Sequence, residues 1–187
     1  MSDQMKASIR GDVERYFRFL HDFGFVVQSV DYHPKSFGNW EVVYASEECL
    51  VEISNDRDGI DLNFMPLNKD GTFRVGIKGM IYCVTQGQKF IDYFSPSPFP
   101  SRDEQMKELA ILLKEYLAQI APYFGSNYQA HKEEILSAEK KWNNFALQQM
   151  QIKIKAEKQA AEAARIASRK RTLSRMRNAI KLFFSKG

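Results

Sequence analysis

The side chains best suited to catalysis or metal binding are scattered along this sequence. Its three histidines, His21, His33 and His131, lie far apart and form no HExxH or similar spacing, so they do not predict a zinc site. His21 precedes a predicted helix end, where an imidazole can cap main-chain carbonyls. The sequence has no GxGxxG motif, no P-loop and no GxSxG nucleophile motif. We therefore expect no catalytic residues, no bound metal and no cofactor.

Two acidic turns, at residues 56–59 and 68–71, resemble the start of a calcium-binding loop because each ends in a glycine. An EF-hand places that glycine sixth and a bidentate glutamate twelfth. Aligned in this way, the twelfth positions are Met65 and Ile77, which cannot bind calcium. These turns are expected to connect strands.

The strongest chemical signal is the segment 165–187, which holds eight Lys/Arg and no acidic residue. Residues 1–128 hold 13 Lys/Arg against 18 Asp/Glu, so the N-terminal part is mildly acidic. On a helix, the large apolar residues of the segment share one face and the basic residues flank it. The basic residues are Arg165, Arg169, Lys170, Arg171, Arg175, Arg177 and Lys181, and the apolar face is Ile166, Leu173, Met176, Ile180, Phe183 and Phe184.

This basic amphipathic segment fits three kinds of partner: an anionic membrane surface, nucleic acid, and the groove of a protein. Each basic residue contributes about 1 kcal/mol at an anionic lipid surface. Nucleic acid would use the same charges but has less need of the terminal phenylalanine pair. In a fourth interpretation, the apolar stripe packs on its own domain or on a second copy.

The elements that must carry these side chains predict an α+β fold. An N-terminal amphipathic helix at residues 3–23 ends at Gly24 and packs on a four-stranded antiparallel meander. Residues 73–94 fit a helical stripe despite three glycines, and Ser101 with Glu104 forms a capping box that begins a further helix. The strands are predicted at residues 25–32, 40–45, 50–54 and 60–64.

A long helical arm follows, because residues 127–168 contain no glycine or proline and are rich in Ala, Lys, Glu and Gln. We expect a globular domain at 1–125, an extended helix at 126–164 and the basic amphipathic helix at 165–187. The arm either packs its first turns on the domain or forms a homodimer through a coiled-coil seam. That seam comprises Trp142, Phe145, Gln149, Ile152 and Ala156.

The composition indicates a folded cytoplasmic protein. The 187 residues are 44% hydrophobic and 27% charged, which is enough to bury a core. No apolar run reaches the roughly 18 residues that a membrane span needs, and the N-terminus lacks a signal peptide. Cys49 and Cys83 are expected to be buried thiols in a reducing compartment, with a disulfide as the alternative. A peripheral location at the inner membrane surface is compatible with the basic segment.

Residues 16–25, 42–46, 51–57 and 60–62 together resemble small bacterial proteins, some of which have been proposed as immunity proteins of polymorphic toxin systems. The resemblance covers about residues 13–65 and brings no catalytic residues. It implies a binding protein that neutralises a partner with an acidic surface. The candidate contacts are Glu47, Glu48, Asp56, Arg57, Asp58 and Asp61.

The sequence thus predicts a non-enzymatic protein-binding module, of immunity or accessory type, with a helical arm for assembly or anchoring. The alternative is a nucleic-acid-binding accessory protein that acts through the basic C-terminal helix. A third interpretation is an enzyme with a site near Tyr32, Trp40, Tyr44 and Arg57.

Overall fold

The computed structural model describes residues 2–57, 59–67, 73–89 and 101–184, with side chains described from Asp3 to Arg171 within these ranges. The chain divides into two compact units, Met1–Asn143 and Asn144–Gly187. The first unit therefore continues past residue 125, where the sequence places the end of the globular domain. The α+β class predicted from the sequence is confirmed.

The N-terminal segment is helical in two parts. Helix α1 spans Ser2–Phe17 and is followed by the 3-10 helix η1, Arg18–Phe23. Gly24 ends it with a φ of 80°, a left-handed conformation that glycine adopts without a steric cost. The predicted C-cap is therefore confirmed. His21 also binds a main-chain carbonyl, because its Nδ1 lies 2.8 Å from the oxygen of Phe25.

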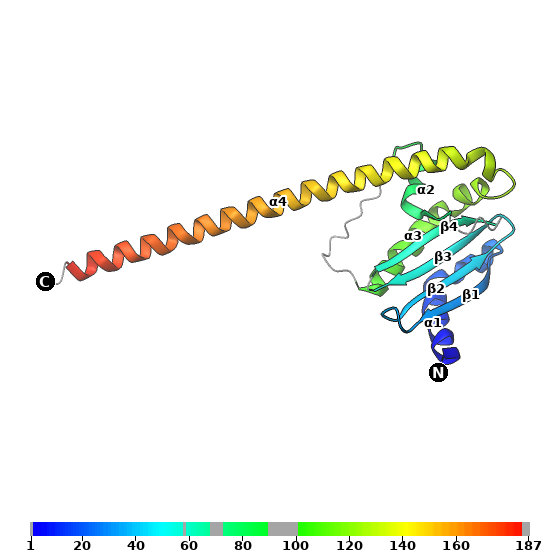
Figure 1. The fold of residues 1–187 in the computed structure, drawn as a ribbon, viewed down its shortest axis with the longest axis horizontal. Coiled ribbons are helices and arrows are strands. Elements are labelled where there is room, and N and C mark those ends of the chain that lie inside the picture. Colours follow the sequence, from blue (N-terminus) through cyan, green and yellow to red (C-terminus); the bar gives the residue numbers. More distant parts are fainter. Residues whose placement is uncertain (1, 58, 68–72, 90–100, 185–187) are drawn as a thin grey trace. The chain divides into compact units, whose positions relative to one another are not determined.

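A five-stranded antiparallel sheet follows, with strands in sequence order from β1 to β5 (Figure 1). The strands are β1 Val26–His33, β2 Asn39–Ala45, β3 Cys49–Asp56, β4 Gly59–Pro66 and β5 Val75–Gly76. The predicted four-stranded meander is present. The short β5 extends it, because Val75 and Gly76 pair with Phe64 and Asn63.

Helices α1 and α3 cover one face of the sheet, and Figure 1 shows both behind the strands. Alternation along the strands directs Val42, Tyr44, Val51, Ile53 and Phe64 to this covered face, where all five are fully buried. The α1 side chains of Val13 and Phe17 meet them there. The opposite face, which we call the open face, carries charged and polar side chains.

The prediction of a helix across residues 73–94 was only partly right. Helix α2 occupies Ile77–Val84, with its first residue directly after β5. It ends at Thr85, and Gln86 and Gly87 have positive φ values that no helix contains. Residues 90–94 lie outside the described residues, as does the predicted connector at 95–100.

Helix α3 spans Arg102–Ile120 and begins at the predicted capping box. The Ser101 hydroxyl accepts from the Glu104 backbone N–H, and the Glu104 carboxylate accepts from the Ser101 N–H at 2.7 Å. The short 3-10 helix η2, Ala121–Tyr123, contains the proline predicted to stop α3. Helix α4 then spans Tyr128–Phe184.

The first turns of α4 belong to the first unit and pack on α2. A Cβ atom added at Gly79 would lie 3.5 Å from the Cα of Glu139, so the glycine permits close approach of the two helices. Ile135, Ala138 and Trp142 of α4 are buried. In the second unit, nearly all described side chains of α4 are exposed.

Candidate functional site

Two hairpin tips at the same end of the sheet bring an exposed phenylalanine and an arginine together. Phe37, between β1 and β2, is 79% exposed, and Arg57 lies in the turn between β3 and β4. The Cζ atom of Arg57 lies 5.3 Å from the centroid of the Phe37 ring, within the range of a cation–π contact. Both residues have positive φ, 57° and 61°. This conformation is uncommon for non-glycine residues and costs free energy, so it marks the tips for functional scrutiny.

Hydrogen bonds fix the backbone of Arg57 while leaving its guanidinium outward. Its N–H donates to Asn39 Oδ1 at 2.9 Å, and Asn39 Nδ2 donates to Asp56 Oδ1 at 2.7 Å. Its carbonyl accepts from Arg102 Nη2 at 3.1 Å. No described carboxylate pairs with the Arg57 guanidinium. We call Phe37, Asn39, Asp56 and Arg57 the tip cluster.

The structure separates the six predicted partner contacts. Asp56 and Arg57 lie in the tip cluster, whereas Asp58 lies outside the described residues. Glu47 and Glu48 lie in the turn between β2 and β3, at the other end of β3. Eight residues of strand span roughly 26 Å, so these residues do not form one small contact surface.

Asp61, the sixth predicted contact, lies on the open face. It occupies one register row with Asp31, Glu41 and Ser54 on the neighbouring strands. Desolvation and, secondarily, Asp56 raise the pKa of the Asp61 carboxyl, while Lys78 opposes them. Asp61 thus belongs to an acidic row.

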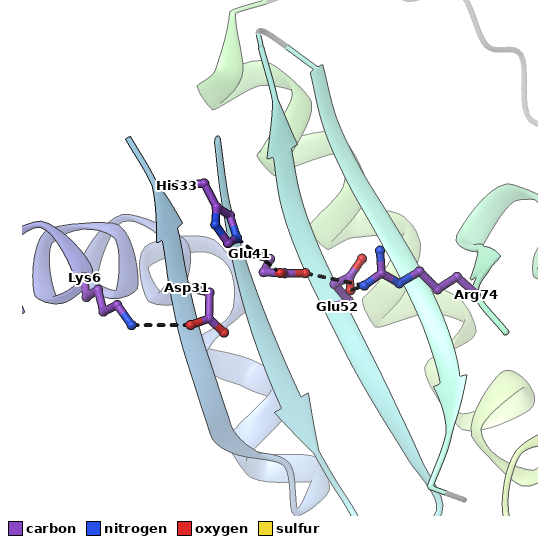
Figure 2. A network of polar contacts seen from close by, with 6 residues as sticks. All are labelled: Lys6, Asp31, His33, Glu41, Glu52 and Arg74. Carbon is purple, nitrogen blue, oxygen red and sulfur yellow. Dashed lines mark hydrogen bonds and ion pairs between the residues drawn. The ribbon is translucent and has the colours of Figure 1, made fainter. Parts of the chain in front are cut away.

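Cations from outside this row neutralise much of it, as Figure 2 shows. Lys6 of α1 reaches Asp31 at 3.4 Å. Arg74, which precedes β5, lies 2.9 Å from Glu52 and 3.6 Å from Glu41. The four-member group Lys6, Asp31, Glu41 and His33 is completed by a 3.6 Å approach of His33 Nε2 to Glu41. The row is therefore an ionic network that ties the first helix and the last strand to the sheet.

Glu52 is the one buried carboxylate of this network, with 1% of its surface exposed. Its burial raises the pKa, Arg74 and Asn63 oppose the rise, and nearby Glu41 adds to it. A carboxyl with a raised pKa can serve as a general acid only where substrate reaches it. Glu52 is covered, and Arg74 engages it, so this arrangement favours a structural role.

A groove lies at the opposite end of the sheet, beside the turn between β2 and β3. It has a volume of about 430 Å³ and is lined by Phe23, Gly24, Phe25, Ser46, Glu47, Glu48, Leu117, Ala118, Ala121 and Pro122. Its floor is mostly apolar, and its two carboxylates are both exposed. We call it the Glu47–Glu48 groove.

The predicted basic segment lies in α4, whose backbone is helical to Phe184. Arg165, Ile166, Arg169, Lys170 and Arg171 are all exposed, as predicted side chains of a solvated helix should be. The other predicted members have side chains outside the described residues: Leu173, Arg175, Met176, Arg177, Ile180, Lys181, Phe183 and Phe184.

The predicted coiled-coil seam is interrupted by its first member. Trp142 is 7% exposed and belongs to the packing of the first unit, whereas Ile152 is 61% exposed. The large exposed apolar residues of the second unit are Leu147, Met150, Ile152, Ile154 and Ile166. A dimer through this helix would therefore use them in place of Trp142.

Residues important to these surfaces escaped the sequence analysis. Phe37 lies in a turn-rich connection, where no periodicity marks it. Arg74 acts on Glu52 from 22 positions further along the chain, so no local pattern predicts the pair. The proposed enzyme site also separates, because Tyr44 is fully buried on the covered face and its pKa is raised to about 12, chiefly by burial.

Within the described ranges, no three His, Cys, Asp or Glu side chains cluster in a way that could hold a metal ion. No described helix has an apolar stretch long enough to cross a bilayer. Comparison of the chain with protein-family models, curated proteins and solved structures finds no match. The candidate surfaces therefore rest on their own geometry.

Proposed function

We propose that this chain is a non-enzymatic protein-binding module whose tip cluster contacts the partner and whose C-terminal helix serves assembly or anchoring. The observation that carries the proposal is the contact between Phe37 and Arg57. An exposed aromatic ring held against an arginine, on two residues with costly backbone conformations, has the composition of a binding hot spot.

The support for a binding role is the rigidity of this surface. Asn39, Asp56 and Arg102 fix the Arg57 backbone by hydrogen bonds, so little conformational entropy is lost when a partner binds. The aromatic ring supplies apolar area, and the guanidinium supplies donors for a carboxylate or carbonyl of the partner. The buried free thiols Cys49 and Cys83 fit a reducing compartment, and we place the action of the protein in the cytoplasm.

The test is quantitative co-purification from a lysate of the source cells with the tagged full chain as bait. Phe37→Ser and Arg57→Ala should each deplete one retained protein by about tenfold or more, as loss of a hot-spot side chain does. The matched control is Ile111→Ser, which removes an apolar residue of 58% exposure on α3. Retention of the same proteins by all variants would contradict the proposal.

A second candidate function is nucleic-acid binding through residues 165–187. The specific observation is a segment with eight basic and no acidic residues, of which the described basic side chains are all exposed. Phosphate binding would weaken steeply with salt, since counterions are released on association. Truncation after Ala164 should abolish it, and binding that is insensitive to salt would rule it out.

A further inference from the structure

The Glu47–Glu48 groove combines an apolar floor with unneutralised negative charge. Phe23 at its edge is 46% exposed, although it is a large apolar residue, and Phe25 beneath is 2% exposed. Leu117, Ala121 and Pro122 complete the floor from α3 and η2. A volume of about 430 Å³ lies within the range of clefts that bind a ligand or a few side chains.

The two carboxylates have no cation within reach. No described Lys, Arg or His forms an ion pair with Glu47 or Glu48, in contrast to Asp31, Glu41 and Glu52 on the open face. The Ser46 hydroxyl accepts from the Glu48 and Cys49 backbone N–H groups, which fixes the turn but leaves both carboxylates outward. An occupant of complementary chemistry therefore needs cations beside large apolar side chains.

One segment of this chain has that composition. Residues 172–186 contain five basic and no acidic residues, and their apolar residues include the pair Phe183–Phe184. The first 128 residues are acidic in sum, so attraction between the two parts extends beyond the groove itself. Charge complementarity thus selects this segment over an acidic or neutral partner.

We propose that the Glu47–Glu48 groove binds the basic C-terminal segment of a second copy of this chain. From Tyr128 to Lys186 the sequence has no glycine or proline, so it supplies none of the usual causes of a sharp helix kink with which a copy would fold its segment back onto its own groove. Two copies that exchange their segments form two equivalent contacts, as in an isologous dimer. This inference rests on the assembly role proposed above for the C-terminal helix and is independent of the tip cluster.

The interface proposed here is small, so the association is reversible and depends on concentration and salt. Sedimentation equilibrium of the full chain should show a monomer–dimer equilibrium at low salt. Glu47→Lys with Glu48→Lys should weaken the dimer at least about tenfold, since like charges then face each other across the contact. The matched control, Glu108→Lys with Glu133→Lys, makes the same charge change at exposed helix positions and should leave the dissociation constant within about twofold.

A charge exchange separates the inference from unfolding and from docking within one copy. The variant Arg175→Glu with Lys181→Glu should also be monomeric alone, because its acidic segment meets an acidic groove. Mixed with the Glu47→Lys, Glu48→Lys variant, it should form a heterodimer in which both grooves face segments of opposite charge. A mixture that stays monomeric would overturn the inference.

The outcomes also distinguish this inference from the proposed function. If the wild-type chain dimerises but groove and control variants weaken the dimer equally, the groove inference fails and the assembly role stands. If the wild-type chain is monomeric at all concentrations, both the groove inference and self-assembly fail. Neither result alters partner retention through Phe37 and Arg57.

Discussion

Phe37 and Arg57 meet across the tips of two different hairpins, with the guanidinium Cζ 5.3 Å from the centre of the ring. Both have left-handed backbone conformations, and the ring is 79% exposed. A contact on the surface between two strained residues contributes little to stability, since cation–π contacts at exposed sites are worth about 0.5–1 kcal/mol. The arrangement is better explained by what it presents to a partner.

Replacing Phe37 with glycine should separate stability from binding. Glycine adopts a φ of 57° without the cost that phenylalanine bears, and its greater freedom in the unfolded chain offsets part of that gain. We therefore expect the free energy of unfolding to change by less than about 1 kcal/mol. Partner retention should fall as in Phe37→Ser. Urea denaturation measures the first quantity, and a loss of several kcal/mol would show that Phe37 is structural.

Removing Arg74 should destabilise the protein in a pH-dependent way. Arg74→Ala leaves the buried Glu52 carboxylate without its cation, and we expect a loss of about 1–3 kcal/mol at pH 7 because Arg74 is half-exposed. The pKa of Glu52 is already raised above its ordinary value of 4.5, so the folded state favours the protonated form. Its contribution to stability is therefore complete below pH 4.5 and is lost as the pH rises through the folded pKa.

The loss caused by Arg74→Ala should accordingly be smaller at pH 5 than at pH 7. Adding Glu52→Gln should restore most of the stability, since no buried charge then remains unpaired. Denaturant unfolding of the single and double variants at both pH values measures this. Equal losses at the two pH values, with no recovery in the double variant, would refute the role given to Glu52.

The contact of α2 with the first turns of α4 depends on the size of residue 79. Gly79→Ala places a Cβ 3.5 Å from the Cα of Glu139, an ordinary contact, and gains up to about 1 kcal/mol of helix propensity. Gly79→Leu exceeds the space and should cost about 1–3 kcal/mol. Thermal unfolding compares them. Similar stabilities for the alanine and leucine variants would show that the helices do not pack this closely.

Both thiols should resist alkylation while the protein is folded. Burial raises the pKa of Cys49 to about 12 and that of Cys83 to about 11, so little reactive thiolate forms at pH 8. Mass spectrometry after iodoacetamide treatment should find no adduct in buffer and two in denaturant. Single Cys49→Ala and Cys83→Ala variants assign each adduct. Rapid labelling of either folded variant would contradict the burial.

Local patterns predicted the elements with their own boundary signals. Ser101 and Glu104 are three residues apart, so the capping box is visible in the sequence, and Gly24 marks the end of the first helix. The alternation of Val51 and Ile53 likewise predicted their shared face. Glu52 between them would be assigned to solvent by the same alternation. It is buried because Arg74, far along the chain, lies against it.

The candidate site was harder to predict because it is assembled from turns. Arg57 was selected from its sequence neighbourhood, but its partner Phe37 depends on the register of β2 with both of its neighbours. Trp142 shows the opposite problem. Its spacing from Phe145 and Ile152 indicates a seam, yet its own ring packs within the first unit.

The most direct test of the account is photo-crosslinking from position 37 in the source cells. A photoreactive phenylalanine analogue at Phe37 of the full chain should yield one adduct of defined mass, and the same analogue at Ile111 should not. The adduct should disappear when Arg57→Ala is added. An absence of adducts from position 37, or the same adducts from both positions, would contradict the claim that the tip cluster binds a protein.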